Sequence, residues 1–339
     1  MTDSGLAPVR IGLVGAGGIA LSHMNAIRTS PHAELSVICD TAVDRARSAA
    51  IDMGSRWTGD LDELLADPEV DAVILCTPNS THEALGERVL RAGKHLLVEK
   101  PLAMTLAGAD RLISLAEQFG LALAVGHSHR FSDQSLALAE VLAAGTIGEP
   151  RFVRIVMNGG WIWPGWQHWV LNPEVSGGHS LHNGVHLMDL ASWWIGDRPV
   201  SVYSRGQRVT SAALDIADYL VTQVEYAGGA SAICEVSRAE RPRNAAALEL
   251  TVVGTEGSVS REWDADGLLR HNDDGFSAPA PSGSAERTFV RELESFVAAT
   301  RTPGTVIPPV SAAREVTALA IASELSLATN RVISLGEIQ

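Results

Sequence analysis

The alternation of short apolar runs with segments of helical periodicity over residues 9–125 restricts the possible folds more than any other feature. Apolar runs that lack a polar face predict strands covered on both sides, as in parallel sheets joined through helices. The sequence therefore predicts a βαβ series, an α/β arrangement with a doubly wound parallel sheet. The runs are VRIGLVG, AELSVICD, DAVILCT, KHLLVE and LALAVG.

The pattern changes beyond residue 150, where strand-like runs follow one another with few helices between them. Consecutive strands joined by turns such as Gly228-Gly229 are typical of an antiparallel sheet. At roughly 150 residues per domain, a chain of 339 residues holds two domains. We expect an α/β domain over residues 1–128 and an α+β domain over residues 129–339.

The net charge of the chain limits the kinds of molecule that it can bind. The chain has 40 acidic and 26 basic residues and a formal net charge of −14, which disfavours nucleic acid and anionic membrane surfaces as partners. The first residues lack the apolar core of a signal peptide, so we expect a cytoplasmic protein. Cys39, Cys76 and Cys234 are far apart in apolar runs, which predicts buried thiols.

A glycine-rich turn follows the first predicted strand. Gly15-x-Gly17-x-x-Ala20 stands between a strand and a helix, where glycines let backbone N–H groups approach a pyrophosphate at the helix N-terminus. In this context the pattern predicts a Rossmann dinucleotide site. A tight turn without a ligand is the alternative interpretation.

Asp40 ends the second predicted strand. A carboxylate there accepts hydrogen bonds from the adenosine ribose and repels a 2′-phosphate, which favours NAD over NADP. The alternative is that Asp40 only caps the following helix.

Two further strand ends carry polar residues at the edge where open α/β sheets bind ligands. In CTPNSTHEAL, Asn79 or Ser80 can cap the next helix. In VEKPLAMT, Lys100 stands between an apolar strand and a proline, where partial desolvation and a neighbouring positive nicotinamide lower the pKa of an amine and suit it to proton exchange. A surface lysine paired with Glu99 is the alternative.

Three histidines occur in GGHSLHNGVHLMDL, and their spacing leaves three interpretations open. His182 and His186 are four apart and share a face of an α-helix, and His179 joins them only if the helix begins there. The cluster is a zinc site, a set of hydrogen-bonded core histidines, or an acid/base pair.

Half of the eight tryptophans fall in NGGWIWPGWQHWVLNPEVSGG. Indole rings stack on the C–H face of a sugar, but they also occur in cores and subunit contacts. The tryptophans are Trp161, Trp163, Trp166 and Trp169, and nearby polar candidates for substrate contacts are His129, Arg130 and His168.

Together, GAGGIA, CTPNSTHEAL, VEKPLAMT, GHSHRF and GGHSLHNGVHLMDL resemble the glucose-fructose oxidoreductase, inositol dehydrogenase and rhizopine-catabolism (Gfo/Idh/MocA) family over nearly the whole chain. The resemblance implies a Rossmann domain, then an open-faced, mainly antiparallel sheet for substrate binding and oligomer contacts. It also implies a nicotinamide cofactor and hydride exchange with a sugar or polyol hydroxyl. In this family a lysine, here Lys100, acts with a histidine matching His186, and His182 stands where an aspartate is usual.

These observations predict an NAD-dependent oxidoreductase that acts on a secondary hydroxyl of a sugar, polyol or glycoside, as a homodimer or homotetramer and without a metal. Redox-neutral glycoside cleavage through transient oxidation is the second hypothesis, and a non-catalytic nucleotide sensor is the third. The predicted catalytic residues are Lys100, His186 and His182. The predicted cofactor contacts are Gly15, Gly17, Gly18, Ile19, Asp40, Thr77, Pro78, Asn79, His82, Glu99 and Lys100, and the predicted substrate contacts are Lys100, His129, Trp161, Trp163, Trp166, His168, His182 and His186.

Overall fold

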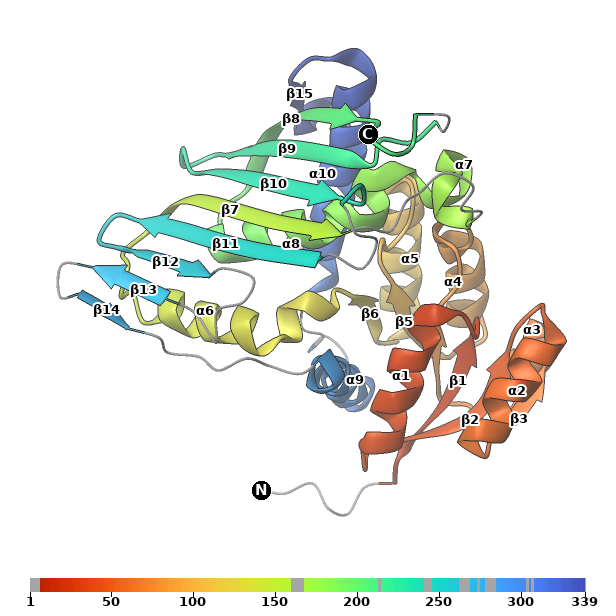
Figure 1. Cartoon of the computed structure of the whole chain (residues 1–339). Helices are drawn as coiled ribbons and strands as arrows, with labels where there is room; N and C mark the ends of the chain where they lie inside the picture. The colour runs from red at the N-terminus through yellow and green to blue at the C-terminus, as the bar shows by residue number, and fades with distance from the viewer. Residues whose placement is uncertain are drawn as a thin grey trace. The chain divides into compact units, whose positions relative to one another are not determined.

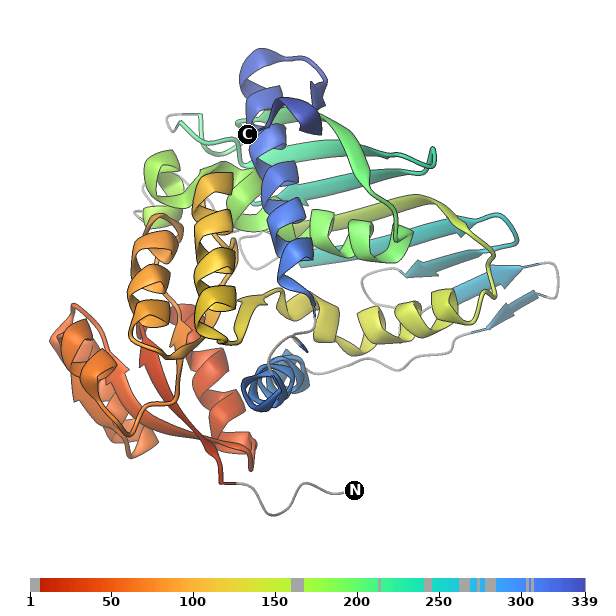
Figure 2. The ribbon, with the colours of Figure 1, turned by 180° about the vertical axis from the view of Figure 1, so that it is seen from behind.

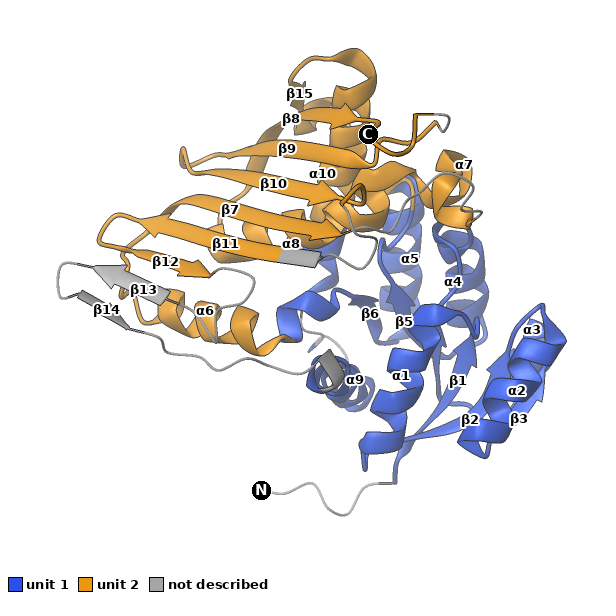
Figure 3. Cartoon of the chain, viewed as in Figure 1, with its two compact units in different colours: residues 1–103, 107–131, 285–314 blue, residues 104–106, 132–284, 315–339 orange. Residues whose placement is uncertain are grey.

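The computed structural model describes residues 7–159, 168–212, 215–240, 246–261, 269–272, 275–277, 285–302, 305 and 308–338 (Figure 1). The chain forms two compact units, which Figure 3 colours separately. The first comprises Met1–Ala103, Ala107–Phe131 and Ala285–Arg314, and the second comprises Met104–Leu106, Ser132–Ser284 and Glu315–Gln339.

The first unit is built on a parallel sheet. Within the described residues its strands are β1 (Val9–Val14), β2 (Ala33–Cys39), β3 (Arg56–Thr58), β4 (Ala72–Leu75), β5 (His95–Glu99) and β6 (Leu123–Gly126). Their order is β3-β2-β1-β4-β5-β6, and every pairing is parallel. The predicted α/β fold with a doubly wound sheet is confirmed.

Helices cover both faces of this sheet, because its strands are apolar on both sides. In β4, Val73 and Leu75 join one buried cluster, whereas Ala72 and Ile74 join the other. The helical segments of this unit are α1 (Gly18–Thr29), α2 (Val43–Met53), α3 (Leu61–Ala66), η1 (Asn79–Thr81), α4 (His82–Arg91), α5 (Leu106–Phe119), η2 (Ser128–Phe131) and α9 (Ala285–Arg301).

The helix α9 returns to the first unit from late in the chain and packs beside α1 (Figures 1 and 2). Its buried side chains Leu293, Phe296 and Val297 share a core with Met24 and Ile27 of α1. A linear division of the chain at residue 128 assigns this helix to the second domain, whereas its apolar stripe completes the core of the first unit.

The second unit contains a nine-stranded sheet, counted over the part of the chain that is described. Its strands are β7 (Pro150–Gly159), β8 (Pro199–Gln207), β9 (Tyr219–Tyr226), β10 (Ser231–Ser237), β11 (Ala246–Gly254), β12 (Ser258–Arg261), β13 (Leu269–Asn272), β14 (Gly275–Ser277) and β15 (Ile333–Ser334). The order is β14-β13-β12-β11-β7-β10-β9-β8-β15, in which only β7 and β10 pair in parallel. The predicted mainly antiparallel sheet is confirmed.

Three helices, α6 (Asp133–Ala143), α8 (Val185–Ile195) and α10 (Val310–Thr329), pack on one face of this sheet (Figure 2). The strands alternate accordingly: in β10, Ala232, Cys234 and Val236 are buried under the helices, whereas Ser231 and Glu235 are only partly buried. None of the described helices is both long enough and apolar enough to cross a lipid bilayer.

Candidate functional site

The turn between β1 and α1 requires glycine at its first position. Gly15 has a φ of +89°, and a Cβ there would lie 2.4 Å from the backbone oxygen of Cys76, at the end of the neighbouring strand β4. The left-handed conformation and this contact exclude every other residue type without rearrangement. Gly15 therefore brings the turn against the next strand end.

The next two glycines, Gly17 and Gly18, face open space. A Cβ at Gly17 or Gly18 would meet no atom within 4 Å. The helix α1 begins at Gly18 without a side-chain cap or an acidic residue in its first turn, and the next residue, Ile19, is exposed. A helix start with uncapped N–H groups and open space in front of it fits the diphosphate of a dinucleotide.

Asp40 supports this turn from the end of β2. Its Oδ2 accepts a hydrogen bond from the backbone N of Ala16 at 2.8 Å, and its Oδ1 accepts one from Ala42 N at 2.8 Å, at the start of α2. The guanidinium of Arg45 lies 3.1 Å away. Asp40 thus holds the glycine turn and the residue before α2, although the helix itself has no side-chain cap at Ala42. A carboxylate has enough lone pairs to accept ribose hydroxyls as well.

The turn after β4 is organised by a threonine. The hydroxyl of Thr81 lies 2.7 Å from both Thr77 Oγ1 and the carbonyl oxygen of Pro78. Asn79 is buried at the start of η1. These contacts fix the predicted cofactor residues Thr77, Pro78 and Asn79 as one rigid turn.

His82 connects this turn to the next strand end. Its ring is fully buried, with Nδ1 2.7 Å from the oxygen of Pro101 and Nε2 2.9 Å from the oxygen of Thr77. Burial lowers the pKa of His82. Because both ring nitrogens lie against carbonyl oxygens, a direct contact between His82 and the cofactor would require the ring to move.

Glu99, Lys100 and Pro101 form the turn after β5, with a cis peptide bond between Lys100 and Pro101. The Glu99 carboxylate is buried and accepts hydrogen bonds from Lys100 N at 3.2 Å and from the His23 ring at 2.9 Å. Burial alone would raise the pKa of Glu99, but the His23 bond and the Lys100 charge lower it. The Glu99 carboxylate is therefore fixed in place against the backbone of Lys100.

His179, His182 and His186, in the second unit, do not lie on one continuous α-helix. Residues Ser180–Gly184 form a π-helical turn, η4, which contains His182 and precedes α8 with His186. The expectation of uniform α-helical spacing from His182 to His186 is therefore wrong. π-helical turns are rare and often occur at functional sites.

The surroundings of the three histidines also differ. His179 is buried, and burial, reinforced by the Arg238 cation, lowers its pKa to about 3. The ring of His182 makes an edge contact with Trp169, with 5.1 Å between ring centroids. Among the described residues, no group of three or more His, Cys, Asp or Glu side chains is arranged to hold a metal ion.

Two interactions that the sequence analysis missed hold the π-helical turn. Glu324 of α10 accepts a hydrogen bond from Ser180 N at 2.8 Å. A Cβ at Gly178 would lie 2.5 Å from the Glu324 carboxyl, so glycine is required there. Asn183 accepts a hydrogen bond from Arg238 at 2.7 Å, and burial lowers the pKa of Arg238 to about 10. Arg238 is thereby placed next to the histidine segment.

The remaining predicted substrate residues fall in different places. His168 is exposed, and its Nδ1 accepts a hydrogen bond from Val170 N at the start of η3 (Trp169–Leu171). His129 lies in η2 of the first unit. Trp161, Trp163 and Trp166 lie outside the described residues.

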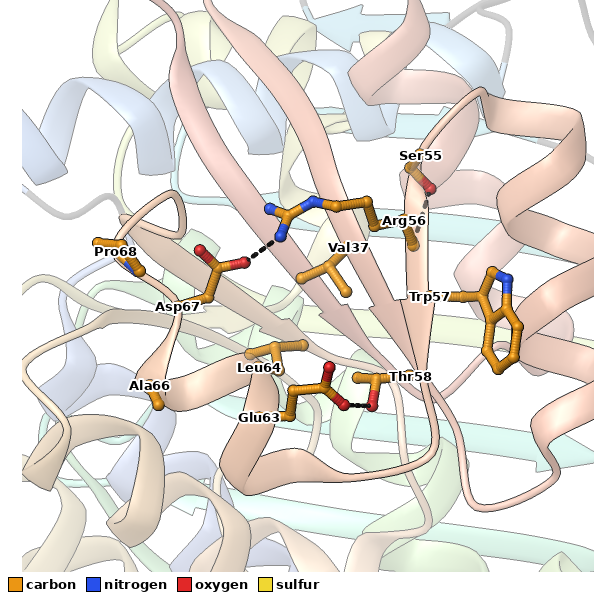
Figure 4. Close-up of a pocket in the computed structure, with 10 residues that line it drawn as sticks. All are labelled: Val37, Ser55, Arg56, Trp57, Thr58, Glu63, Leu64, Ala66, Asp67 and Pro68. Atoms are coloured by element: carbon orange, nitrogen blue, oxygen red, sulfur yellow. Dashed lines mark hydrogen bonds and ion pairs between the residues drawn. The ribbon is translucent and has the colours of Figure 1, made fainter.

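One surface hollow lies apart from these residues, beside the edge strand β3, and has a volume of about 600 Å³. Figure 4 shows Arg56 reaching toward Asp67, at 2.6 Å, and Glu63 toward Thr58, at 2.5 Å. Its polar groups pair with each other, and none of the predicted site residues lines it.

Comparisons with known proteins agree with this architecture. Residues 9–127 match the family described as an oxidoreductase family with an NAD-binding Rossmann fold, and residues 135–260 match the GFO/IDH/MocA C-terminal domain. The inositol 2-dehydrogenase of Rhizobium meliloti (strain 1021) is 29% identical over 96% of this chain and 99% of its own length.

Further relatives extend the comparison. The myo-inositol 2-dehydrogenase of Thermotoga maritima is 31% identical over 68% of this chain and 69% of its own length. The crystal structure of GenD2 from gentamicin A biosynthesis, in complex with NAD, has a TM-score of 0.86 at 26% identity and covers 97% of both chains. By its two matched domains and these relatives, the chain belongs to the Gfo/Idh/MocA family of NAD-dependent oxidoreductases.

Proposed function

We propose that this oxidoreductase transfers a hydride between NAD and a secondary hydroxyl of a cyclic polyol or sugar. The relatives named as inositol dehydrogenases support the substrate class. The observation that carries the proposal is the Glu99–Lys100 turn at the carboxyl end of β5, in which the buried Glu99 carboxylate accepts a hydrogen bond from the backbone N of Lys100. Ligands of open α/β sheets bind at this edge.

Bound NAD⁺ supplies the hydride acceptor. The chain's own residues handle the proton of the substrate hydroxyl: the Lys100 amine orients the oxygen and stabilises its developing negative charge, and His186 accepts the proton. Both nitrogens must then reach the same substrate oxygen, at roughly 2.6–3.2 Å. Trp161, Trp163, Trp166, His168 and His129 remain proposed substrate contacts.

His182 modulates His186 in this proposal. A second imidazole, unlike the aspartate usual at this position, does not favour the imidazolium form of its neighbour. His186 therefore releases its proton more readily than in relatives with an aspartate, which favours oxidation of the substrate at neutral pH.

Asp40 directs the choice of cofactor. Its buried carboxylate lies at the end of β2, where it repels a 2′-phosphate, so NADH binds more tightly than NADPH. Fluorescence titration of the protein with both cofactors tests this preference, and equal dissociation constants would contradict it.

A redox-neutral reaction is the second candidate. Oxidation at one ring carbon acidifies the neighbouring C–H bond and permits elimination of a glycosidic substituent, after which the hydride returns. The histidine in place of the usual aspartate is the feature that favours it, because it alters the proton transfers at the site.

Product analysis separates the candidates. Inositols, hexoses and aryl glycosides are incubated with the protein and NAD⁺, and both NADH absorbance and aglycone release are recorded. NADH formed in proportion to a ketone product supports the dehydrogenase. Aglycone release without NADH supports the redox-neutral reaction, and turnover of nothing in the panel despite NADH binding counts against both.

A further inference from the structure

A histidine of the nucleotide-binding helix is buried against the turn that carries Lys100. His23 of α1 is 1% exposed, and its Nε2 lies 2.9 Å from Glu99 Oε1. The Phe289 ring of α9 meets the His23 ring edge-on, with 5.2 Å between centroids. Packing therefore fixes the orientation of His23, and the hydrogen bond fixes that of Glu99.

A second carboxyl group is buried in the same region. Glu292 lies on α9, one turn after Phe289, and is 3% exposed. Over the described part of the chain, neither of its carboxyl oxygens has a hydrogen-bond partner. Burial raises the pKa of Glu292 well above its ordinary value, and the negative charge of Glu99 raises it further. Burial therefore favours the protonated form of the Glu292 carboxyl group.

Besides His23 and Glu292, the titratable groups that interact electrostatically with Glu99 include Cys76, His82 and Lys100. The Cys76 thiol, at the end of β4, has a pKa raised by burial and by Glu99 and Glu292. The His82 ring, on α4, has a pKa lowered by burial. Gly126 of β6 lies directly against the Glu99 carboxyl group. A Cβ at Gly126 would lie 3.1 Å from that group.

We propose that His23 is a positioning residue that acts through Glu99, and that Glu292 is a neutral buried carboxyl group beside them. The His23 hydrogen bond holds the Glu99 carboxylate in place against the backbone of Lys100, and the negative charge of Glu99 orients the Lys100 amine and favours its ammonium form. The inference deepens the proposed function, since it rests on the role of Lys100 in proton transfer.

The hydrogen bond between His23 and Glu99 also connects helix α1, which follows the glycine-rich turn, with the turn that carries Lys100. The helix α1 begins at Gly18, in the proposed diphosphate site, and carries His23 less than two turns later. A shift of α1 when the dinucleotide binds would reach Glu99 through one hydrogen bond. Loss of that bond frees the Glu99 carboxylate to turn away from Lys100, and the amine then loses the nearby charge that favours its ammonium form.

The chain allows a direct measurement, because Lys94 and Lys100 are its only lysines. The full-length protein, without cofactor or substrate, is acylated with trace acetic anhydride at a series of pH values, and acetylation of each lysine is quantified by mass spectrometry. The midpoint of the pH profile reports the pKa of each amine. Lys94, whose amine donates to the carbonyls of Asp67 and Val70, serves as the internal reference.

The His23 variants test the hydrogen bond. His23→Leu should lower the Lys100 midpoint by about 1 pH unit and leave that of Lys94 unchanged. His23→Gln keeps an N–H donor and should restore the wild-type midpoint. His95→Leu, which removes a histidine at the opposite end of β5, is the matched control and should have no effect. If His23→Leu does not fold, His23→Asn, whose amide is shorter, replaces it.

A neutral replacement tests whether the Glu292 carboxyl group is protonated. Glu292→Gln should leave the Lys100 midpoint unchanged and should remove an infrared band of a protonated carboxyl group at neutral pH. A lower midpoint in this variant would mean that Glu292 is charged and would overturn the inference, as would equal midpoints in wild type and His23→Leu.

Turnover provides the second readout. With a substrate from the panel, His23→Leu should lower kcat more than it raises KM, and His23→Gln should recover kcat. Because acylation requires neither cofactor nor substrate, a failure of the proposed function appears only in turnover. If the role of His23 is wrong, His23→Leu leaves the midpoint of Lys100 acylation unchanged.

Discussion

At the scale of single residues, the glycines of the first turn differ in what a methyl group would meet. Gly15 has a positive φ and the Cys76 oxygen in front of it, whereas Gly17 faces open space. The same substitution at the two positions therefore separates folding from cofactor binding.

Gly17→Ala should leave thermal stability within a few degrees of wild type and weaken NADH binding at least about tenfold, because the added methyl enters the proposed diphosphate space. Gly15→Ala should lower the melting temperature as well, since strain and a backbone clash accompany the loss of binding. Thermal unfolding and NADH fluorescence measure both effects. Unchanged NADH affinity in Gly17→Ala would place the dinucleotide elsewhere.

The histidine pair makes a prediction about pH. His182→Asp puts a carboxylate near His186 and favours its imidazolium form, so the acidic limb of the kcat/KM profile should move to higher pH by about 1 unit. His182→Asn, a neutral replacement, is the control. An acidic limb that stays in place would show that the two positions are not coupled.

Sequence reasoning identified residues whose neighbours in the chain explain them and missed those whose partners are remote. The glycine turn and the Glu99–Lys100 turn are local patterns beside predicted strands. His23 bonds to a residue 76 positions away, so nothing near it in the sequence marks it. In the sequence, Glu292 is one of several charged residues of an amphipathic helix, and only the fold shows that it is buried.

At the scale of elements, the π-helical turn η4 could not be predicted from spacing, because the residues of GGHSLHNGVH fit an α-helix equally well. Two of its residues, Ser180 and Asn183, contact Glu324 of α10 and Arg238 at the end of β10, which are remote in the sequence. The strands were predictable, because alternation and apolar runs are local consequences of burial.

The helix α9 makes a prediction about stability. Glu292 has a raised pKa in the folded state, so between its ordinary value of 4.5 and that raised value the folded state binds more protons than the unfolded state. The stability of the wild type therefore falls as pH rises through this range, by up to about 1.4 kcal/mol per pH unit, whereas Glu292→Gln escapes this loss.

Urea unfolding from about pH 4.5 to about pH 7.5 measures the difference. The stability of Glu292→Gln relative to wild type should increase with pH, and Glu294→Gln, at a partly exposed position of the same helix, should show no such trend. A constant difference across this range would mean that Glu292 ionises normally in the folded protein.

At the scale of the whole molecule, the order of strands and helices predicted both fold classes, but not the division of the chain between the units. The helix α9 follows the second sheet in sequence and packs on the first unit. Its apolar stripe was visible, whereas the surface that it covers was not, because a stripe specifies a buried face without specifying the partner. The same limit applies to any residue of one unit that acts with residues of the other.

The central claim is that hydride moves between a substrate carbon and NAD while Lys100 serves the hydroxyl. The most direct test incubates the protein and NAD⁺ with inositols and hexoses deuterated at their ring carbons and analyses the cofactor by mass spectrometry. We predict deuterated NADH with the wild type and a rate lower by about 10²–10⁴-fold with Lys100→Met, which still binds NADH. Product that forms while the cofactor gains no deuterium, or a Lys100→Met variant as active as wild type, would contradict the account.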